Sequence, residues 1–87
     1  MRTYDCTFFC DPGHGWLRVS GTLLEELGLE DRISPYSYQR GRFVYLEEDR
    51  DLPLFSDAMT RIGRPIHIRE VYTNGPSKIR RYASYGE

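Results

Sequence analysis

The chain has 87 residues, of which 39% are hydrophobic, 14% aromatic and 29% charged, and its formal net charge is −1. This composition predicts one ordered domain over residues 1–87 with a small core rich in aromatic rings, and it excludes a disordered tail. The near-neutral charge argues against a strongly basic nucleic-acid-binding protein and against an acidic mimic of DNA.

The cysteines and the hydropathy pattern predict a cytoplasmic protein. Cys6 and Cys10 lie in a segment that alternates like a strand, which would hold them roughly 13 Å apart, so both are expected to be free thiols. No apolar run approaches the roughly 20 residues of a membrane-spanning helix. Residues 1–5 lack the apolar middle of a secretion signal. Together these two observations lead us to expect a cytoplasmic protein without a membrane partner.

The first elements in chain order are two strands joined by a turn. Residues 3–10 alternate with the period of a strand, and residues 16–19 alternate again. Residues 11–15 between them contain a proline and two glycines, which favour tight turns. The chain therefore begins with a predicted β-hairpin that has a longer loop.

A short helix is predicted next. Thr22 and Glu25 fit a capping box, in which their side chains bond to exposed backbone N–H groups. Gly28 supplies a left-handed stop, so the helix should have about two turns. Residues 29–40 then predict an irregular connection, because Pro35 blocks a helix and holds Ser34 extended.

The second half of the chain predicts strand, helix and strand. Residues 43–47 are aromatic and β-branched with apolar side chains on both faces, which indicates a central strand. Asp51 is expected to cap a helix that runs to about Ile62 with one apolar stripe. Residues 66–72 predict a last long strand, and residues 77–85 predict a further strand or a loop held against the body.

The element order is therefore β-β-α-β-α-β with extra β in the tail. This order predicts an α+β fold of two layers, in which two helices cover one face of a mostly antiparallel sheet.

The turn around His14 is the strongest candidate for a functional site. Gly13 and Gly15 should present His14 at a loop tip, beside Trp16, the only tryptophan. An imidazole there suits proton transfer, metal ligation or binding of an anion. The structural alternative is that His14 caps the hairpin with Trp16 packed beneath it.

An acidic run follows the central strand. Glu47, Glu48, Asp49 and Asp51 could hold a divalent cation, and with His14 the first three could support metal-assisted hydrolysis. The spacing fits no familiar metal motif, and acidic residues at the start of a helix are expected from the helix dipole. The structural interpretation is favoured, and no metal or other cofactor is expected.

The C-terminal segment mixes cations with aromatic rings, the chemistry that holds phosphates and stacks on bases. Its candidate residues are Arg80, Tyr82 and Tyr85. The same cations could instead pair with the acidic run, within one molecule or across a homodimer interface. Tyr36 and Tyr38 add rings in the predicted connection, and such side chains are favoured at recognition surfaces.

Four segments together resemble a family of small uncharacterised proteins encoded by bacteriophages and prophages. They are Asp11-Pro-Gly-His-Gly-Trp-Leu17, Ile33-Ser-Pro-Tyr-Ser-Tyr38, Val44-Tyr-Leu-Glu-Glu-Asp49 with Asp51, and Ser77-Lys-Ile-Arg-Arg-Tyr82. The resemblance covers most of the chain and implies an accessory factor in the host cytoplasm. It departs at Arg50, where such sequences have an uncharged residue, often cysteine, which weighs further against a metal site.

The leading hypothesis is a non-enzymatic binding protein that engages a host or defence-system macromolecule, with inhibition as one outcome. The alternatives are nucleic-acid or nucleotide binding by the basic aromatic tail and a metal-assisted hydrolase built on His14. The predicted binding residues are His14, Trp16, Tyr36, Tyr38, Arg80, Tyr82 and Tyr85.

Overall fold

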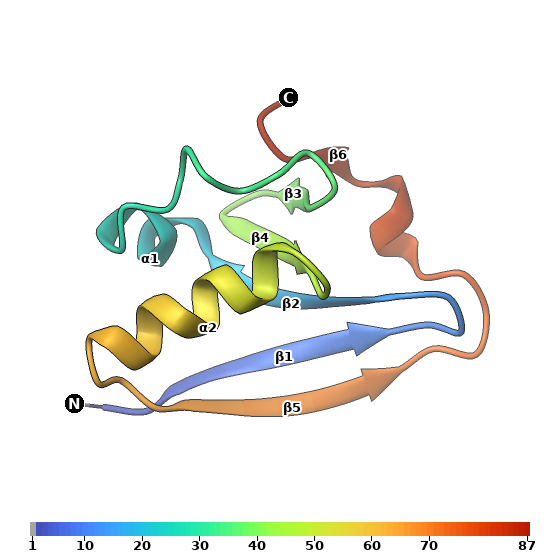
Figure 1. The fold of residues 1–87 in the computed structure, drawn as a ribbon. Helices are drawn as coiled ribbons and strands as arrows, with labels where there is room; N and C mark the ends of the chain where they lie inside the picture. The colour runs from blue at the N-terminus through green and yellow to red at the C-terminus, as the bar shows by residue number, and fades with distance from the viewer. Residues whose placement is uncertain (1) are drawn as a thin grey trace.

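The computed structural model describes residues 2–87, which form one β-sheet with two α-helices packed on the same face (Figure 1). The strands are β1 (Tyr4–Cys10), β2 (Gly15–Ser20), β3 (Tyr38–Arg40), β4 (Phe43–Glu47), β5 (Ile66–Tyr72) and β6 (Ala83–Ser84). The helices are α1 (Gly21–Glu26), α2 (Asp51–Arg61) and the 3₁₀ helix η1 (Lys78–Arg81).

The sheet has the strand order β5-β1-β2-β4-β3-β6. Neighbouring strands are antiparallel except β1 and β5, which run parallel. The parallel pair arises because α2 carries the chain from β4 across the sheet to the outer side of β1 (Figure 1). The predicted α+β fold with a mostly antiparallel sheet is therefore confirmed.

One face of the sheet packs against α1 and α2. Directly paired residues of neighbouring strands point to the same face, so Phe8 of β1, Leu17 of β2 and Leu46 of β4 lie side by side. Leu24 of α1 and Phe55 of α2 complete this core. The apolar stripe predicted for the second helix therefore faces the sheet, as expected for an amphipathic helix.

The opposite face has a smaller core that depends on the end of the chain. Trp16 of β2, Tyr45 of β4 and Ile79 of η1 are buried together there. The predicted further strand or loop of the tail is thus a 3₁₀ turn followed by the two-residue strand β6, which pairs with β3. This segment covers part of the face that lies away from the helices.

Two predicted helix caps are wrong. Ser20, the last residue of β2, caps α1 by accepting a hydrogen bond from the Leu23 N–H, whereas Thr22 lies inside the helix and is exposed. Asp51 is the first residue of α2 and is buried, and its carboxylate accepts hydrogen bonds from Ser34 and Ser37. The bonds that Asp51 makes to the connection replace the predicted cap.

The predicted irregular connection is also partly wrong, because its last three residues form β3. The free cysteines are confirmed: Cys6 and Cys10 form no disulfide. No helix within residues 2–87 has the length and apolar character that crossing a membrane requires.

Candidate functional site

The turn between β1 and β2 is built around the Asp11 carboxylate. Its Oδ1 accepts hydrogen bonds from the backbone N–H groups of Gly13 and His14, each at 3.0 Å, which closes the turn. Gly15 follows, and a side chain there would collide with the Phe8 ring, so this glycine permits close packing. The local sequence therefore fixes where His14 emerges.

The same carboxylate ties the turn to the C-terminal segment. Both oxygens of Asp11 accept hydrogen bonds from the Arg80 guanidinium at 2.8 Å, and Oδ2 also accepts from the Ser77 N–H at 2.8 Å. These bonds hold the pKa of Asp11 well below its usual value, and the bond from Arg80 has the largest effect. Asp11 in turn raises the pKa of Arg80. One buried acid thus joins two segments that are far apart in the sequence.

His14 is held by Glu47 across the β2–β4 pair. Its Nε2 lies 2.8 Å from Glu47 Oε2, and because a carboxylate only accepts, the imidazole donates this bond. The Glu47 side chain also accepts the N–H groups of Asp49 at 3.0 Å and Arg50 at 2.8 Å. Glu47 therefore orders both His14 and the loop that leads into α2, and His14 is only partly exposed rather than fully presented at a loop tip.

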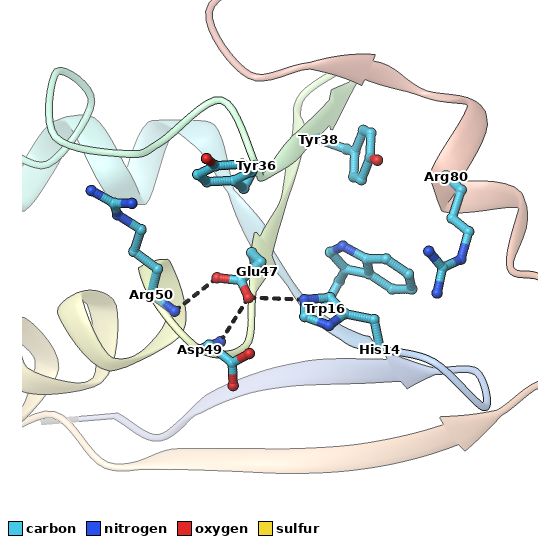
Figure 2. Close-up of a pocket in the computed structure, with 8 residues that line it drawn as sticks. All are labelled: His14, Trp16, Tyr36, Tyr38, Glu47, Asp49, Arg50 and Arg80. Carbon is cyan, nitrogen blue, oxygen red and sulfur yellow. Dashed lines mark hydrogen bonds and ion pairs between the residues drawn. The ribbon is translucent and has the colours of Figure 1, made fainter.

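These side chains surround a pocket of about 440 Å³ (Figure 2). Figure 2 shows Tyr36 and Arg50 on one side of it, and Trp16 and Arg80 on the other. The lining residues are His14, Trp16, Tyr36, Tyr38, Glu47, Asp49, Arg50 and Arg80. Five of the predicted binding residues, from the β1–β2 turn, the connection and the tail, therefore meet in one place.

The interpretation of Trp16 as a binding side chain offered to a partner is wrong, because only 1% of the residue is accessible. Its ring contacts the edge of His14 at 5.4 Å and that of Tyr38 at 6.2 Å between centroids, and the Arg80 guanidinium lies over it at 5.1 Å. The indole Nε1 is buried without a hydrogen-bond partner among the described residues. Figure 2 shows this nitrogen on the edge of the ring that faces Tyr36 and Glu47.

Tyr36 is an exposed wall of the pocket, at 64% accessibility, and the Arg50 guanidinium lies over its ring at 5.8 Å. The next residue, Ser37, is fully buried. Its hydroxyl donates to Asp51 at 2.5 Å and accepts the Glu47 N–H at 2.9 Å. The exposed tyrosine therefore stands on a backbone that is fixed directly beneath it.

Tyr82 and Tyr85 lie outside this pocket. Tyr82 packs against Tyr45 at 5.1 Å between ring centroids. The Tyr85 hydroxyl donates to the Glu30 carbonyl at 2.5 Å, and burial raises the pKa of this hydroxyl. Two of the seven predicted binding residues are thus outside the pocket. Arg50 lines the pocket but was not predicted to bind, although it lies within the acidic run of residues 47–51.

The pocket also offers a group of candidate metal ligands. His14, Glu47 and Asp49 each place one ligand atom within 4.8 Å of the others. One imidazole nitrogen and two carboxylates form a donor set that suits zinc or manganese. Binding would require Glu47 to exchange its bond to His14 for a bond to the ion.

No protein-family model, curated protein or solved structure matches the chain.

Proposed function

We propose that the chain is a small accessory binding protein, whose pocket takes a projecting side chain or chain end of a macromolecular partner. The observation that carries this proposal is the unpaired Nε1–H of Trp16, buried at the wall of the pocket. A buried donor without an acceptor costs about 1–3 kcal/mol. An oxygen of a partner, from a carbonyl or a carboxylate, would supply the missing acceptor by displacing the groups that now cover this nitrogen, since Trp16 is 1% accessible.

The size and lining of the pocket support an occupant of limited size. A volume of about 440 Å³ lies toward the lower end of the range for ligand sites, and it suits one or two side chains. The rings of Tyr36 and Tyr38 offer apolar contact at low entropy cost, which is why tyrosine is frequent in binding sites. Arg50 and Asp49 add charges of both signs at the rim, which favour a polar partner.

The resemblance to small phage proteins suggests the setting. In that setting the partner is a host enzyme or a defence complex in the host cytoplasm, and occupation of one of its surfaces would inhibit it. The chain acts in this proposal by binding rather than by catalysis.

A pair of matched tyrosines tests the proposal. Tyr36 and Tyr72 have similar exposure, 64% and 62%, but Tyr72 lies on β5 and does not line the pocket. In pulldowns from bacterial lysate followed by quantitative mass spectrometry, a genuine partner should be captured by the wild type and by Tyr72→Ala. The Tyr36→Ala variant should lose it. Equal capture by all three proteins would refute binding through the pocket.

A second candidate function, metal-assisted hydrolysis, is favoured by the convergence of His14, Glu47 and Asp49. A three-ligand site that stays open to the pocket would leave a position for water, as hydrolytic metal sites do. Titration calorimetry with Zn²⁺ and Mn²⁺ should then detect one site in the wild type. The site should be lost in His14→Ala and retained in His67→Ala, which removes the only other histidine. No binding to the wild type would eliminate this function.

A further inference from the structure

The sheet face that lies away from α1 and α2 carries an excess of positive charge outside the pocket. Six cations gather there, and the only carboxylate among the residues that line its two hollows is Asp5, which pairs with His67 at 3.2 Å. The cations are Arg18, Arg40, Arg42, Arg69, Lys78 and Arg81. The net charge of −1 therefore hides a strong separation of charge between the two sides of the molecule.

These cations are not neutralised by the protein itself. Among residues 2–87, none of the six forms an ion pair with a carboxylate. Several lie on aromatic rings instead: the Arg18 guanidinium is 4.9 Å from the centre of the Phe43 ring, and that of Arg40 is 5.0 Å from the centre of the Tyr82 ring. A guanidinium that lies over a ring can still donate N–H groups to an anion.

The shape of the face fits an extended ligand. Two hollows, of about 530 Å³ and 480 Å³, adjoin each other because Arg18 lines both. The first contains Phe9, Tyr45 and Tyr82, and the second contains Phe43. From β5 to β4 the face is roughly 14 Å wide at the usual strand spacing, so several successive flat groups could lie across it.

We propose that this face binds single-stranded nucleic acid. Phosphates would pair with the unneutralised cations, and the guanidinium groups that turn to the phosphates would uncover the rings of Phe9, Phe43 and Tyr82 for unstacked bases. A duplex is a poorer fit, because its bases are already stacked and cannot reach rings that lie in a sheet. This site is independent of the proposed partner pocket, because the two share no lining residue.

The site differs from the sequence-based alternative in the residues that form it. Of the tail residues predicted to bind nucleic acid, Arg80 is paired with Asp11 and the Tyr85 hydroxyl is turned toward Glu30. Lys78, Arg81 and Tyr82 remain on the face, and strand residues complete it. Residues that are distant in the sequence thus supply most of the positive charge.

Fluorescence anisotropy with a labelled oligothymidylate of roughly 12 nucleotides tests the proposal. If four of the six cations contact phosphates, a plot of the logarithm of the association constant against the logarithm of the salt concentration should have a slope of about −3. Between about 50 and 200 mM salt this slope is a loss of roughly fiftyfold. A flat salt dependence, or tighter binding of the matching duplex, would overturn the proposal.

A charge-matched pair of variants locates the binding face. Arg42→Glu with Arg81→Glu changes two exposed cations of the face, and Arg32→Glu with Arg61→Glu makes the same change in net charge outside it. The first variant should bind at least about tenfold more weakly, with a slope reduced by about 1.4, and the second should bind nearly as the wild type does. Equal losses in both variants would refute the assignment to this face.

One further variant tests the role of stacking. Phe43→Leu keeps an apolar side chain but removes the ring under Arg18 and Arg42. Loss of a stacked base should weaken binding by about fivefold or more, and unchanged affinity would contradict stacking on this platform. The Tyr36→Ala variant should bind the oligonucleotide normally, so failure of the pocket proposal and failure of this one are distinguishable.

Discussion

Asp11 determines both the conformation of the His14 turn and the position of the C-terminal segment. It accepts hydrogen bonds from the backbone of Gly13, His14 and Ser77 and from the Arg80 guanidinium. Sequence reasoning treated residues 11–15 as a turn because of their glycines and proline. It could not find the pairing with Arg80, because nothing local in the sequence indicates which of twelve cations meets a given acid.

The lowered pKa of Asp11 makes the stability of the protein depend on pH. The carboxyl has an ordinary pKa of about 3.9 in the unfolded chain and a lower one in the folded protein, mainly because of Arg80. Its contribution to stability is therefore complete above pH ~4 and is lost as the pH falls through the folded pKa. Urea unfolding at pH 7, 4 and 2 should show that Asp11→Asn lowers stability at pH 7 but has a smaller acid loss than the wild type.

The control for this prediction is Asp31→Asn, which changes an exposed carboxylate by the same atom exchange. It should keep the acid dependence of the wild type. An Asp11→Asn variant whose stability falls with acid as steeply as that of the wild type would contradict the assigned role.

Trp16 and Tyr36 illustrate what sequence can say of a single side chain. The glycines correctly indicated a turn, but the burial of Trp16 depends on η1, which lies more than sixty residues later in the chain. Tyr36 is exposed and Ser37 is buried because the Ser37 hydroxyl is held inside by Asp51 and by the Glu47 N–H. Residue type indicated five residues of the pocket but also Tyr82 and Tyr85, which lie outside it, and it did not indicate the exposure of each side chain.

At the scale of elements, the strands with clear alternation were predictable and their pairing was not. Residues 3–10 were recognised because a period of two marks a strand, and residues 43–47 because aromatic and β-branched side chains favour one. Residues 66–72 were also correctly predicted as a strand. The parallel pairing of β1 with β5 was not evident, because alternation carries no information about direction. The strand β3 was missed because three residues after a proline are too few for a pattern.

The start of α2 is the element boundary on which the pocket wall depends. The buried carboxylate of Asp51 accepts the Ser34 hydroxyl at 2.6 Å and the Ser37 hydroxyl at 2.5 Å, and these bonds hold the connection against the helix. The cap predicted from sequence failed here because the carboxylate serves these distant hydroxyls. An aspartate that caps a helix and an aspartate that holds a loop are the same residue type, so the sequence alone does not distinguish the two roles.

Replacing Asp51 should therefore loosen the connection as well as destabilise the fold. In Asp51→Asn, the donors of Ser34 and Ser37 would meet a neutral amide in place of the carboxylate. We expect the free energy of unfolding to fall by roughly 1–3 kcal/mol. Equilibrium urea unfolding measures this loss. Asp57→Asn, on the exposed side of the same helix, should change stability by less than about 0.5 kcal/mol. Equal effects of the two variants would show that the bonds to the serines contribute little.

At the scale of the whole molecule, the C-terminal segment closes the second core. Ile79 of η1 is 2% accessible and packs against Trp16 and Tyr45. The general class of fold followed from the order of elements, and residues 77–85 were expected to form a further strand or a loop held against the body. The part of the sheet that they cover was not evident from the sequence. Its position depends on Asp11, Ser77 and Arg80, whose hydrogen bonds join residues more than sixty positions apart in the sequence.

Truncating Ile79 should destabilise the protein and alter the surroundings of Trp16. Ile79→Ala leaves a cavity under η1, which costs about 2–5 kcal/mol for a buried side chain of this size. The emission of the single tryptophan should move to longer wavelength as water reaches the ring. The control, Ile68→Ala on β5, removes a side chain that is 44% exposed and should leave the emission unchanged. Unaltered emission in Ile79→Ala would contradict the packing beneath η1.

The direction of β1 has a practical result for anyone who attaches another domain. The seven residues of this strand separate Tyr4 from the His14 turn by roughly 23 Å, and Figure 1 shows the N-terminus at the opposite end of the sheet from that turn. A fusion ahead of Tyr4 would leave the pocket mouth open. An extension beyond Glu87 would begin beside Gln39 of β3, which donates to the Glu87 carbonyl at 3.0 Å, and so at the β3–β6 edge of the sheet.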